Sequence, residues 1–271
     1  MTLRMLTVHA HPDDEASRGA ATVARYTAEG VRAVLVTCTD GGAGAVLNPA
    51  AGDSFTPQEF IRTRAAELEA SARGLGYAAT HTLGYRDSGT DGTAGGDRAF
   101  IRVPLDEAAA GLARLIEQER PHTVVGYGTN HTRDPHPDHI RVNEVLTRAV
   151  ELLDHPPVVH HIAFSRRRHL ALHDACVRRG VPSPYEGGLN HPPSAFDDDR
   201  ITTLVEVGRD AITRRLDALR SHVTQIPPDS GWFALTPEEL LEAFPHEEYI
   251  RVGPPSPDPA GRHDLFAGAV T

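Results

Sequence analysis

Cysteine is scarce in this chain, and long apolar runs are missing. Two of its 271 residues are cysteine, Cys38 and Cys176, so at most one disulfide could form. Proteins kept inside the cell usually hold their cysteines reduced, and we expect two buried thiols. The longest apolar runs, such as residues 31–36, are far too short to cross a bilayer. Because the N-terminus also shows no secretory signal pattern, the sequence predicts a cytoplasmic protein with no membrane partner.

The chain also has no excess of positive charge. Its 27 Lys and Arg residues are outnumbered by 37 Asp and Glu residues, which gives a formal net charge of −10. Proteins bind nucleic acids by neutralising phosphates with Lys and Arg, so we expect no nucleic-acid partner. Hydrophobic residues make up 39% of the chain and charged residues 24%, which is typical of a soluble globular protein.

Short apolar segments alternate with stretches of helical periodicity. We expect strands at residues 3–8, 31–37, 81–85, 122–127, 158–164 and 201–207. This alternation predicts an α/β fold with a Rossmann-like, mainly parallel sheet flanked by helices. Residues 1–155 would form the core. Residues 156–271 would form a C-terminal extension that packs on it within one structural unit.

Three local signals make finer predictions. Apolar residues at helical spacing over residues 16–27, followed by Gly30, predict one continuous helix. Thr236, with a proline after it and Glu239 three residues on, predicts the start of a short helix. The tail after Val252 is dense in proline and glycine, and we expect no regular structure there.

Two short motifs concentrate the chemistry of the chain. Residues 9–15 read His-Ala-His-Pro-Asp-Asp-Glu, and residues 136–139 read His-Pro-Asp-His. Each motif follows a predicted strand, so both should lie at the carboxyl edge of the sheet, where open parallel sheets bind ligands. Both also lie in residues 1–155, which makes the core the metal-binding, catalytic part. The extension is then expected to shape the substrate pocket.

These motifs contain the side chains that a divalent metal ion requires. Zinc selects imidazole and carboxylate groups, and a catalytic site needs three protein ligands and one open position. His11, Asp14 and His139 can supply the three ligands. Asp13 and His136 would then face whatever occupies the open position, as in a metal-assisted hydrolase.

Other interpretations have less support. Aspartates after proline often only cap helices, and Asp13, Asp14 and Asp138 could do so. The first strand is not followed by G-x-G-x-x-G, and no G-x-S-x-G elbow stands between a strand and a helix. A structural zinc module would prefer four ligands rich in cysteine. A protein that binds sugar conjugates without turnover is a further alternative, which a turnover assay with added zinc would decide.

The motifs resemble those of the N-acetylglucosaminyl-phosphatidylinositol de-N-acetylase superfamily, also called LmbE-like or PIG-L. Its members carry A-H-P-D-D-E near the N-terminus and H-P-D-H in mid-chain, which stand here at residues 10–15 and 136–139. The likeness is greatest to the mycothiol S-conjugate amidases and the related deacetylases of N-acetylglucosaminyl-inositol. It also includes residues 86–89, 224–226 and 231–233, and it extends to about Tyr249.

The resemblance implies a ligand set for one Zn²⁺ ion per chain, with another divalent ion such as Fe²⁺ as the alternative: His11, Asp14 and His139. It implies Asp13 as the general base. His136 would assist the oxyanion and the leaving amine, and Asp138 would orient His136.

The same resemblance implies residues that contact the substrate. Arg64 matches an arginine that contacts the glycosyl-inositol, and Asp87 is a weaker sugar-binding candidate. Arg18 is expected near the acyl part, and Gln225 belongs to the shared segment 224–226. Asp134 stands where the mycothiol enzymes usually have a tyrosine, and it either binds substrate in place of that tyrosine or fills a turn.

The expected activity is zinc-dependent hydrolysis of the amide bond in a mycothiol S-conjugate. The alternative is deacetylation of an N-acetylglucosaminide, such as N-acetylglucosaminyl-inositol or an aminosugar intermediate. The departures at Asp134 and in the loop at residues 42–45 favour a related thioglycoside or aminosugar in a natural-product pathway. The partner is thus a small molecule, and a homo-oligomer is left open.

Overall fold

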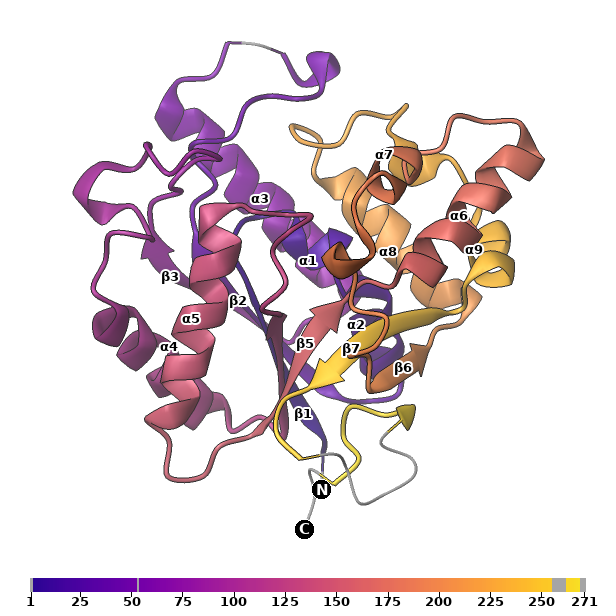
Figure 1. The fold of residues 1–271 in the computed structure, drawn as a ribbon. Helices are drawn as coiled ribbons and strands as arrows, with labels where there is room; N and C mark the ends of the chain where they lie inside the picture. The colour runs from indigo at the N-terminus through magenta and orange to yellow at the C-terminus, as the bar shows by residue number, and fades with distance from the viewer. Residues whose placement is uncertain (1, 53, 255–261, 269–271) are drawn as a thin grey trace.

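A seven-stranded sheet forms the centre of the molecule (Figure 1). The computed structural model describes residues 2–52, 54–254 and 262–268. In spatial order the strands are β3 (Ala79–Tyr85), β2 (Arg32–Thr39), β1 (Arg4–His9), β4 (Thr123–Tyr127), β5 (Val158–Ala163), β7 (His246–Arg251) and β6 (Thr203–Glu206). The strands from β3 to β5 are parallel, whereas β7 is antiparallel to β5 and to β6. The predicted mainly parallel α/β sheet is confirmed.

The order of the strands creates a switch point beside β1. From β1 the chain proceeds to β2 and β3 on one side, and it later returns to place β4 and β5 on the other side. Loops that leave the carboxyl ends of β1 and β4 therefore diverge, and the crevice between them is where open α/β sheets bind their ligands. Both sequence motifs follow these two strands.

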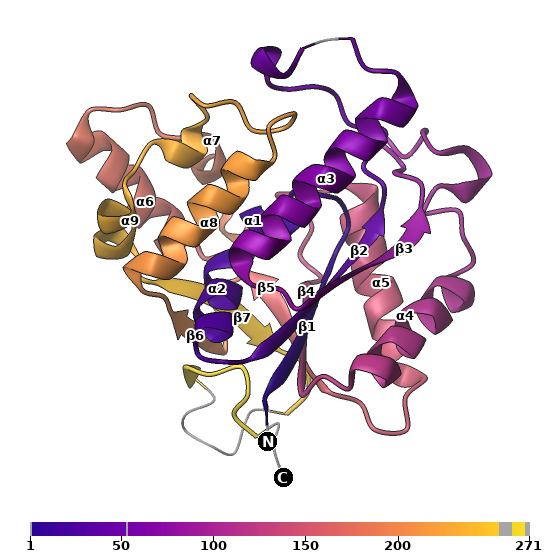
Figure 2. The same cartoon turned by 180° about the vertical axis from the view of Figure 1, so that it is seen from behind.

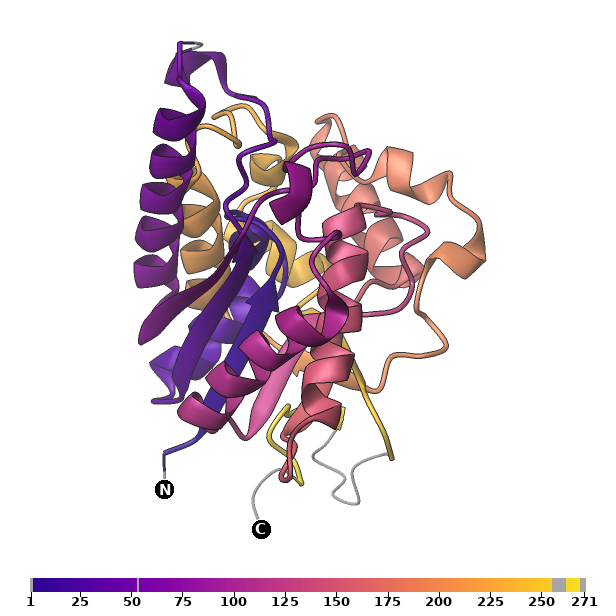
Figure 3. The same cartoon turned by 90° about the vertical axis from the view of Figure 1, so that its left-hand side faces the viewer.

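Helices cover both faces of the sheet, as the side view shows (Figure 3). The helices are α1 (Asp14–Ser17), α2 (Ala20–Ala28), α3 (Pro57–Leu75), α4 (Leu105–Glu119), α5 (Pro137–Glu151), α6 (Arg166–Arg179), α7 (Glu186–Leu189), α8 (Arg209–Ser221) and α9 (Pro237–Ala243). Helices α4 and α5 pack together on one face. On the other face α3 lies beside α8, which also contacts α2 (Figure 2).

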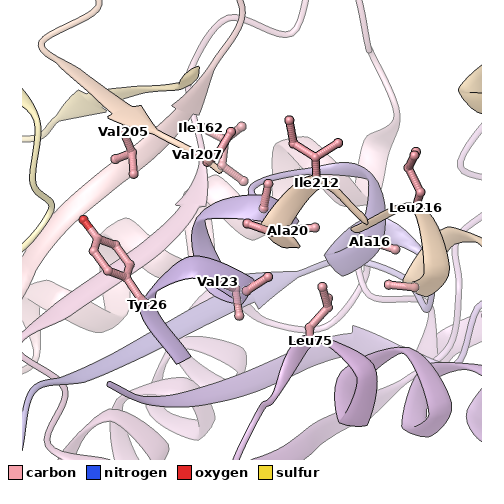
Figure 4. Packing of buried hydrophobic residues seen from close by; sticks show 14 of the residues in the cluster. Ala16, Ala20, Val23, Tyr26, Leu75, Ile162, Val205, Val207, Ile212 and Leu216 are labelled. Atoms are coloured by element: carbon pink, nitrogen blue, oxygen red, sulfur yellow. The ribbon is translucent and has the colours of Figure 1, made fainter. Parts of the chain in front are cut away.

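The larger hydrophobic cluster joins the N-terminal helices to the C-terminal part of the chain. Ala20 and Val23 of α2 pack with Leu75 at the end of α3 and with Ile212 and Leu216 of α8 (Figure 4). Burial of such side chains is worth about 1.5–3 kcal/mol each for the larger ones. Because β4 also pairs with β5, residues on both sides of position 155 share one sheet and one core.

The helix predicted over residues 16–27 is wrong in one respect, because it is two helices. Helix α1 ends at Ser17 and α2 begins at Ala20. Gly19 between them has φ of +74°, a conformation that L side chains rarely adopt. A Cβ on Gly19 would also lie 3.1 Å from the hydroxyl of Tyr249. The chain therefore turns sharply between the metal motif and α2.

Strand β7 was not predicted, because it carries two buried acids. Neighbouring strand residues point in opposite directions, and Glu247 and Glu248 each bind a different helix terminus. Glu247 accepts hydrogen bonds from the amides of Ala21 and Thr22 in the first turn of α2. Glu248 accepts from the amide and hydroxyl of Ser165, which caps α6. These contacts offset the cost of burying charge.

The smaller predictions can also be compared with the structure. Cys38 and Cys176 are free and buried, as expected. Thr236 and Glu239 form the predicted capping box at the start of α9. The described tail residues 262–268 contain no α-helix or strand, but Leu265 and Phe266 are buried against the core. In the described part of the chain, no helix is both long and apolar enough to cross a membrane.

Candidate metal centre and active site

The two motifs meet at the carboxyl ends of β1 and β4. His11 and Asp14 follow β1, and His139 lies in the first turn of α5. Asp14 Oδ2 is 3.3 Å from His11 Nδ1 and 3.4 Å from His139 Nε2. All three side chains are buried. Two segments more than 120 residues apart in sequence thus bring one carboxylate and two imidazoles together.

Two of the donor separations suit a divalent cation. Zinc bonds to nitrogen or oxygen of about 2.0–2.1 Å at tetrahedral angles place neighbouring ligand atoms about 3.3–3.4 Å apart. The two separations from Asp14 match that spacing. Among the described residues, none forms a hydrogen bond with the buried His139 Nε2, which suits an atom that binds a metal ion. Nitrogen atoms of His11, His136 and His139 lie within 4.8 Å of one another.

His11 is held by acids on its other ring nitrogen. Asp138 Oδ2 lies 3.1 Å from His11 Nε2, and Asp87 Oδ1 lies 3.7 Å from it. Asp138 is fully buried and also accepts a hydrogen bond of 3.0 Å from the Ser88 amide. Carboxylates placed this way keep the proton on Nε2 and leave Nδ1 free as a ligand atom.

The expected pairing of the Asp138 carboxylate with His136 is therefore corrected. The Asp138 side chain contacts His11, and only its backbone amide reaches His136, at 3.2 Å from Nδ1. His136 caps α5, and its ring stands edge-on to that of His11 with the centroids 4.5 Å apart. Because Nδ1 accepts a hydrogen bond, a neutral His136 carries its proton on Nε2.

Asp134 has a definite contact of its own. Its Oδ2 accepts a hydrogen bond of 2.8 Å from His139 Nδ1 and a second one from Arg18. Arg18 also donates to Asp14 Oδ1 at 3.2 Å. Burial alone would raise the pKa of Asp134, but the hydrogen bond from His139 and the charge of Arg18 outweigh it and lower this pKa. Asp134 thus orients His139 in the way that outer carboxylates hold metal-binding histidines.

Asp13 lies beside the three donor side chains in a strained backbone conformation. Its φ is +108°, which is rare for a residue other than glycine. Arg64 donates to Asp13 Oδ2 at 2.8 Å, and the Glu15 carboxylate accepts the Asp13 amide at 2.9 Å. Burial raises the pKa of Asp13 to about 6, against the opposing charge of Arg64. A carboxylate of this basicity suits proton abstraction near neutral pH.

Comparison with known proteins identifies the family. The model of a family described as GlcNAc-PI de-N-acetylase matches residues 6–150. A mycothiol S-conjugate amidase of Streptomyces coelicolor is 35% identical, over 98% of this chain and 97% of its own. A 1D-myo-inositol 2-acetamido-2-deoxy-alpha-D-glucopyranoside deacetylase of Acidothermus cellulolyticus is 38% identical, over 99% of this chain and 96% of its own.

The chain belongs to the GlcNAc-PI de-N-acetylase family, also called PIG-L. It is a hydrolase of the amidase and deacetylase class. Among solved structures, the N,N'-diacetylchitobiose deacetylase of Pyrococcus horikoshii has the same fold, with a TM-score of 0.63. That likeness covers 92% of this chain and 83% of the other, at 19% sequence identity.

Three residues that the PIG-L resemblance assigns to the substrate have defined contacts with protein atoms. Arg64 is 3% exposed and donates to Asp13 and to the carbonyl oxygens of Pro12 and Gly41. The buried Gln225 donates to the Ala45 carbonyl at 3.0 Å. Asp87, also buried, accepts the amides of Ala43 and Gly89 and faces His11. These contacts hold the loop after β2 and the first motif in place.

A cavity of about 470 Å³ opens on one side of the PIG-L site. It reaches from His139, Arg18 and Asp134 to residues of α6 and α8 and to the segment around Trp232. Figure 1 shows α1, α6, α7 and α8 gathered in that part of the molecule. Four arginines line this cavity, which we call the arginine cavity: Arg18, Arg133, Arg168 and Arg215. Arg64, Asp87 and Gln225 do not line it.

Two contributions to the site were missed from the sequence. Tyr127, the last residue of β4, stacks on the His139 ring with the centroids 4.6 Å apart. The wholly buried His222 places Nε2 2.6 Å from Glu15 Oε1, and Ser71 donates to the same carboxylate oxygen. Glu15 belongs to the first motif and could have been singled out. His222 lies 207 residues further on, and no local pattern points to it.

Proposed function

We propose that this chain hydrolyses the amide bond of a mycothiol S-conjugate with one bound divalent ion, Zn²⁺ in the first instance and Fe²⁺ as the alternative. The proposal is carried by Asp14, whose Oδ2 lies 3.3 Å from His11 Nδ1 and 3.4 Å from His139 Nε2, with Asp13 beside these side chains. The name of the Streptomyces coelicolor relative supports the choice of substrate. The substrate is a small N-acylated glucosaminyl-inositol, and the products are a free amine and a carboxylic acid.

The protein residues would share the proton transfers. When bound, the ion would act as a Lewis acid on the amide carbonyl and lower the pKa of water at the site. Arg64 occupies Asp13 Oδ2, so Oδ1 is available to accept a proton from the attacking water. A neutral His136 carries its proton on Nε2, from where it can stabilise the developing oxyanion. The proton that Asp13 accepts from the attacking water would then pass to the leaving nitrogen, which restores the Asp13 carboxylate.

Deacetylation is the second candidate. The Acidothermus cellulolyticus relative, 38% identical, is named as a deacetylase of an N-acetylglucosaminyl-inositol. Asp134, which orients His139, replaces the tyrosine expected at that position, and a natural-product aminosugar stays a prediction from that departure. Mass spectrometry of the products distinguishes the two activities. The amidase releases glucosaminyl-inositol and an N-acetylcysteine S-conjugate, whereas the deacetylase releases acetate.

The base is tested with Asp13→Asn. This variant keeps the shape of the side chain but cannot accept the proton, so we expect kcat to fall at least about 100-fold while the metal content stays equal to that of the parent. Asp97→Asn, an exposed acid outside the site, is the matched control and should retain full activity. Turnover of Asp13→Asn at the parental rate would show that Asp13 is not the base.

Removal of the ion tests the cofactor. Dialysis against a chelator should abolish hydrolysis, and Zn²⁺ or Fe²⁺ should restore it in proportion to the ion bound. His139→Ala should bind less metal under the same conditions, since it deletes a ligand. Full activity after complete metal removal would overturn the proposed mechanism.

A further inference from the structure

The arginine cavity holds more positive charge than its own acids neutralise. Its four arginines are accompanied by two aspartates, Asp134 and Asp197. Asp134 is already engaged with His139 and Arg18. Asp197 accepts the Phe164 amide and pairs with Arg200 outside the cavity. Neither acid is paired with Arg168 or Arg215.

Arg215 is the decisive residue. Only 8% of it is exposed, and in the described part of the chain its guanidinium makes no hydrogen bond and no ion pair. Its one contact of note is the ring of Trp232, 5.5 Å from its central carbon. Burial lowers the pKa of Arg215, and Glu247, whose charge opposes this shift, is bound to the amides of α2. A buried guanidinium without a partner is costly unless a ligand supplies the anion.

Arg168 has a similar setting. It is half-buried in α6, its side chain makes no ion pair with any residue that the structure describes, and it stacks over the Phe164 ring at 5.7 Å. Tyr185, Leu172 and Trp232 add apolar surface to the same wall. The cavity therefore combines two uncompensated guanidinium groups with aromatic faces.

The cavity opens beside the proposed ligand His139. Arg18, which the family resemblance places near the acyl part, also lines it. An amide carbonyl held at His139 would thus direct its acyl chain toward Arg168 and Arg215.

We propose that the preferred substrate carries an anionic group, such as a carboxylate, at the far end of an aromatic or apolar acyl chain, and that Arg215 and Arg168 bind this anion in the arginine cavity. This inference rests on the proposed amide hydrolysis. It adds a second, distal recognition point to the amide that is cleaved.

The test uses matched N-acyl glucosaminyl-inositols. Each acyl group is a phenyl ring with one to three linker carbons and carries either a para carboxylate or the neutral para carboxamide. At the best linker length we expect kcat/KM for the carboxylate to exceed that for the carboxamide at least about tenfold. The preference should shrink to within about twofold in Arg215→Met and Arg168→Met, while hydrolysis of the N-acetyl substrate stays unchanged.

Arg220→Met is the matched control. Arg220 lies on the same helix as Arg215 and stacks on Phe233 at 4.5 Å, but it is exposed and outside the cavity. It should keep the full preference. If Arg215→Met does not fold, Arg168→Met still tests the inference, because Arg168 is only half-buried. Equal rates for carboxylate and carboxamide at every linker length, or an unchanged preference in the folded variants, would overturn the inference.

A binding experiment distinguishes failure of this inference from failure of the proposed function. If no acyl substrate is hydrolysed, calorimetry of the free 3-(4-carboxyphenyl)propanoate against its carbamoyl counterpart still tests the anion site. Both compounds carry the carboxylate that would face His139, so a difference reports on the distal group alone. Tighter binding of the diacid by about tenfold, lost in Arg215→Met and kept in Arg220→Met, supports the inference. Equal binding refutes it.

Discussion

Asp134→Asn tests how the proposed ligand His139 is held. The Asp134 carboxylate accepts a hydrogen bond of 2.8 Å from His139 Nδ1 and also pairs with Arg18. Asparagine keeps the size of the side chain and one acceptor oxygen but removes the charge, and charge-assisted hydrogen bonds are roughly twice as strong as neutral ones. We expect the ring to become a weaker and less ordered ligand. If Asp134 orients His139, the substitution should weaken metal binding. If Asp134 only fills a turn, metal binding should stay unchanged.

The size of the effect follows from comparable outer contacts. Loss of a carboxylate that orients a metal-binding histidine typically costs 10–100-fold in metal affinity, or about 1.4–2.7 kcal/mol. Competition between the apoenzyme and a chelating indicator measures that affinity, and kcat at saturating metal should change much less. Asp197→Asn, an acid of the same cavity without contact to His139, is the control and should bind metal like the parent. Parental affinity in Asp134→Asn would refute the role, because asparagine is itself a good turn residue.

Three further predictions follow from buried contacts. Arg64→Gln should lower kcat about tenfold or more and change KM less than about threefold, because Arg64 binds Asp13. A rise in KM alone would instead show that Arg64 contacts the sugar. His222→Gln should lower the free energy of unfolding by about 3 kcal/mol or more in chemical denaturation, since it leaves Glu15 buried without its charge partner, and an unchanged midpoint would contradict this. Burial lowers the pKa of His160 to about 3, whereas the pKa of this histidine in the unfolded chain is about 6.5. Below about pH 6.5 the unfolded chain therefore binds a proton that the folded chain does not, and the free energy of unfolding falls as the pH drops. From pH 8 to pH 5 this histidine alone should cost about 2 kcal/mol, and His160→Gln should remove that part of the pH dependence.

Asp134 and the arginine cavity lie next to each other at the edge of the proposed metal site. Asp134 stands where a tyrosine is expected, and it binds His139 and Arg18. The arginine cavity opens beside this residue.

The sequence by itself determined the class of fold and the chemistry of the ligands. Alternating apolar segments require a parallel sheet because each βαβ unit must bury its strand on both faces. The spacing of His11 and Asp14 after one strand, and of His139 after another, follows from that sheet, since parallel strands end at one edge. The capping box at Thr236 was equally local, because its two hydrogen bonds join residues only three apart.

Tertiary structure alone decided what surrounds those ligands. The Asp138 carboxylate contacts His11 and not His136, and Arg64 binds Asp13. Strand β7 contains two acids that are buried in the interior. Such contacts depend on which distant groups share a buried space, and no periodicity in the chain encodes that. The same holds for the uncompensated charge of Arg215, which a local pattern would assign to a solvated helix face. Only its position against Trp232, beneath the cavity, removes it from water and leaves it in need of an anion.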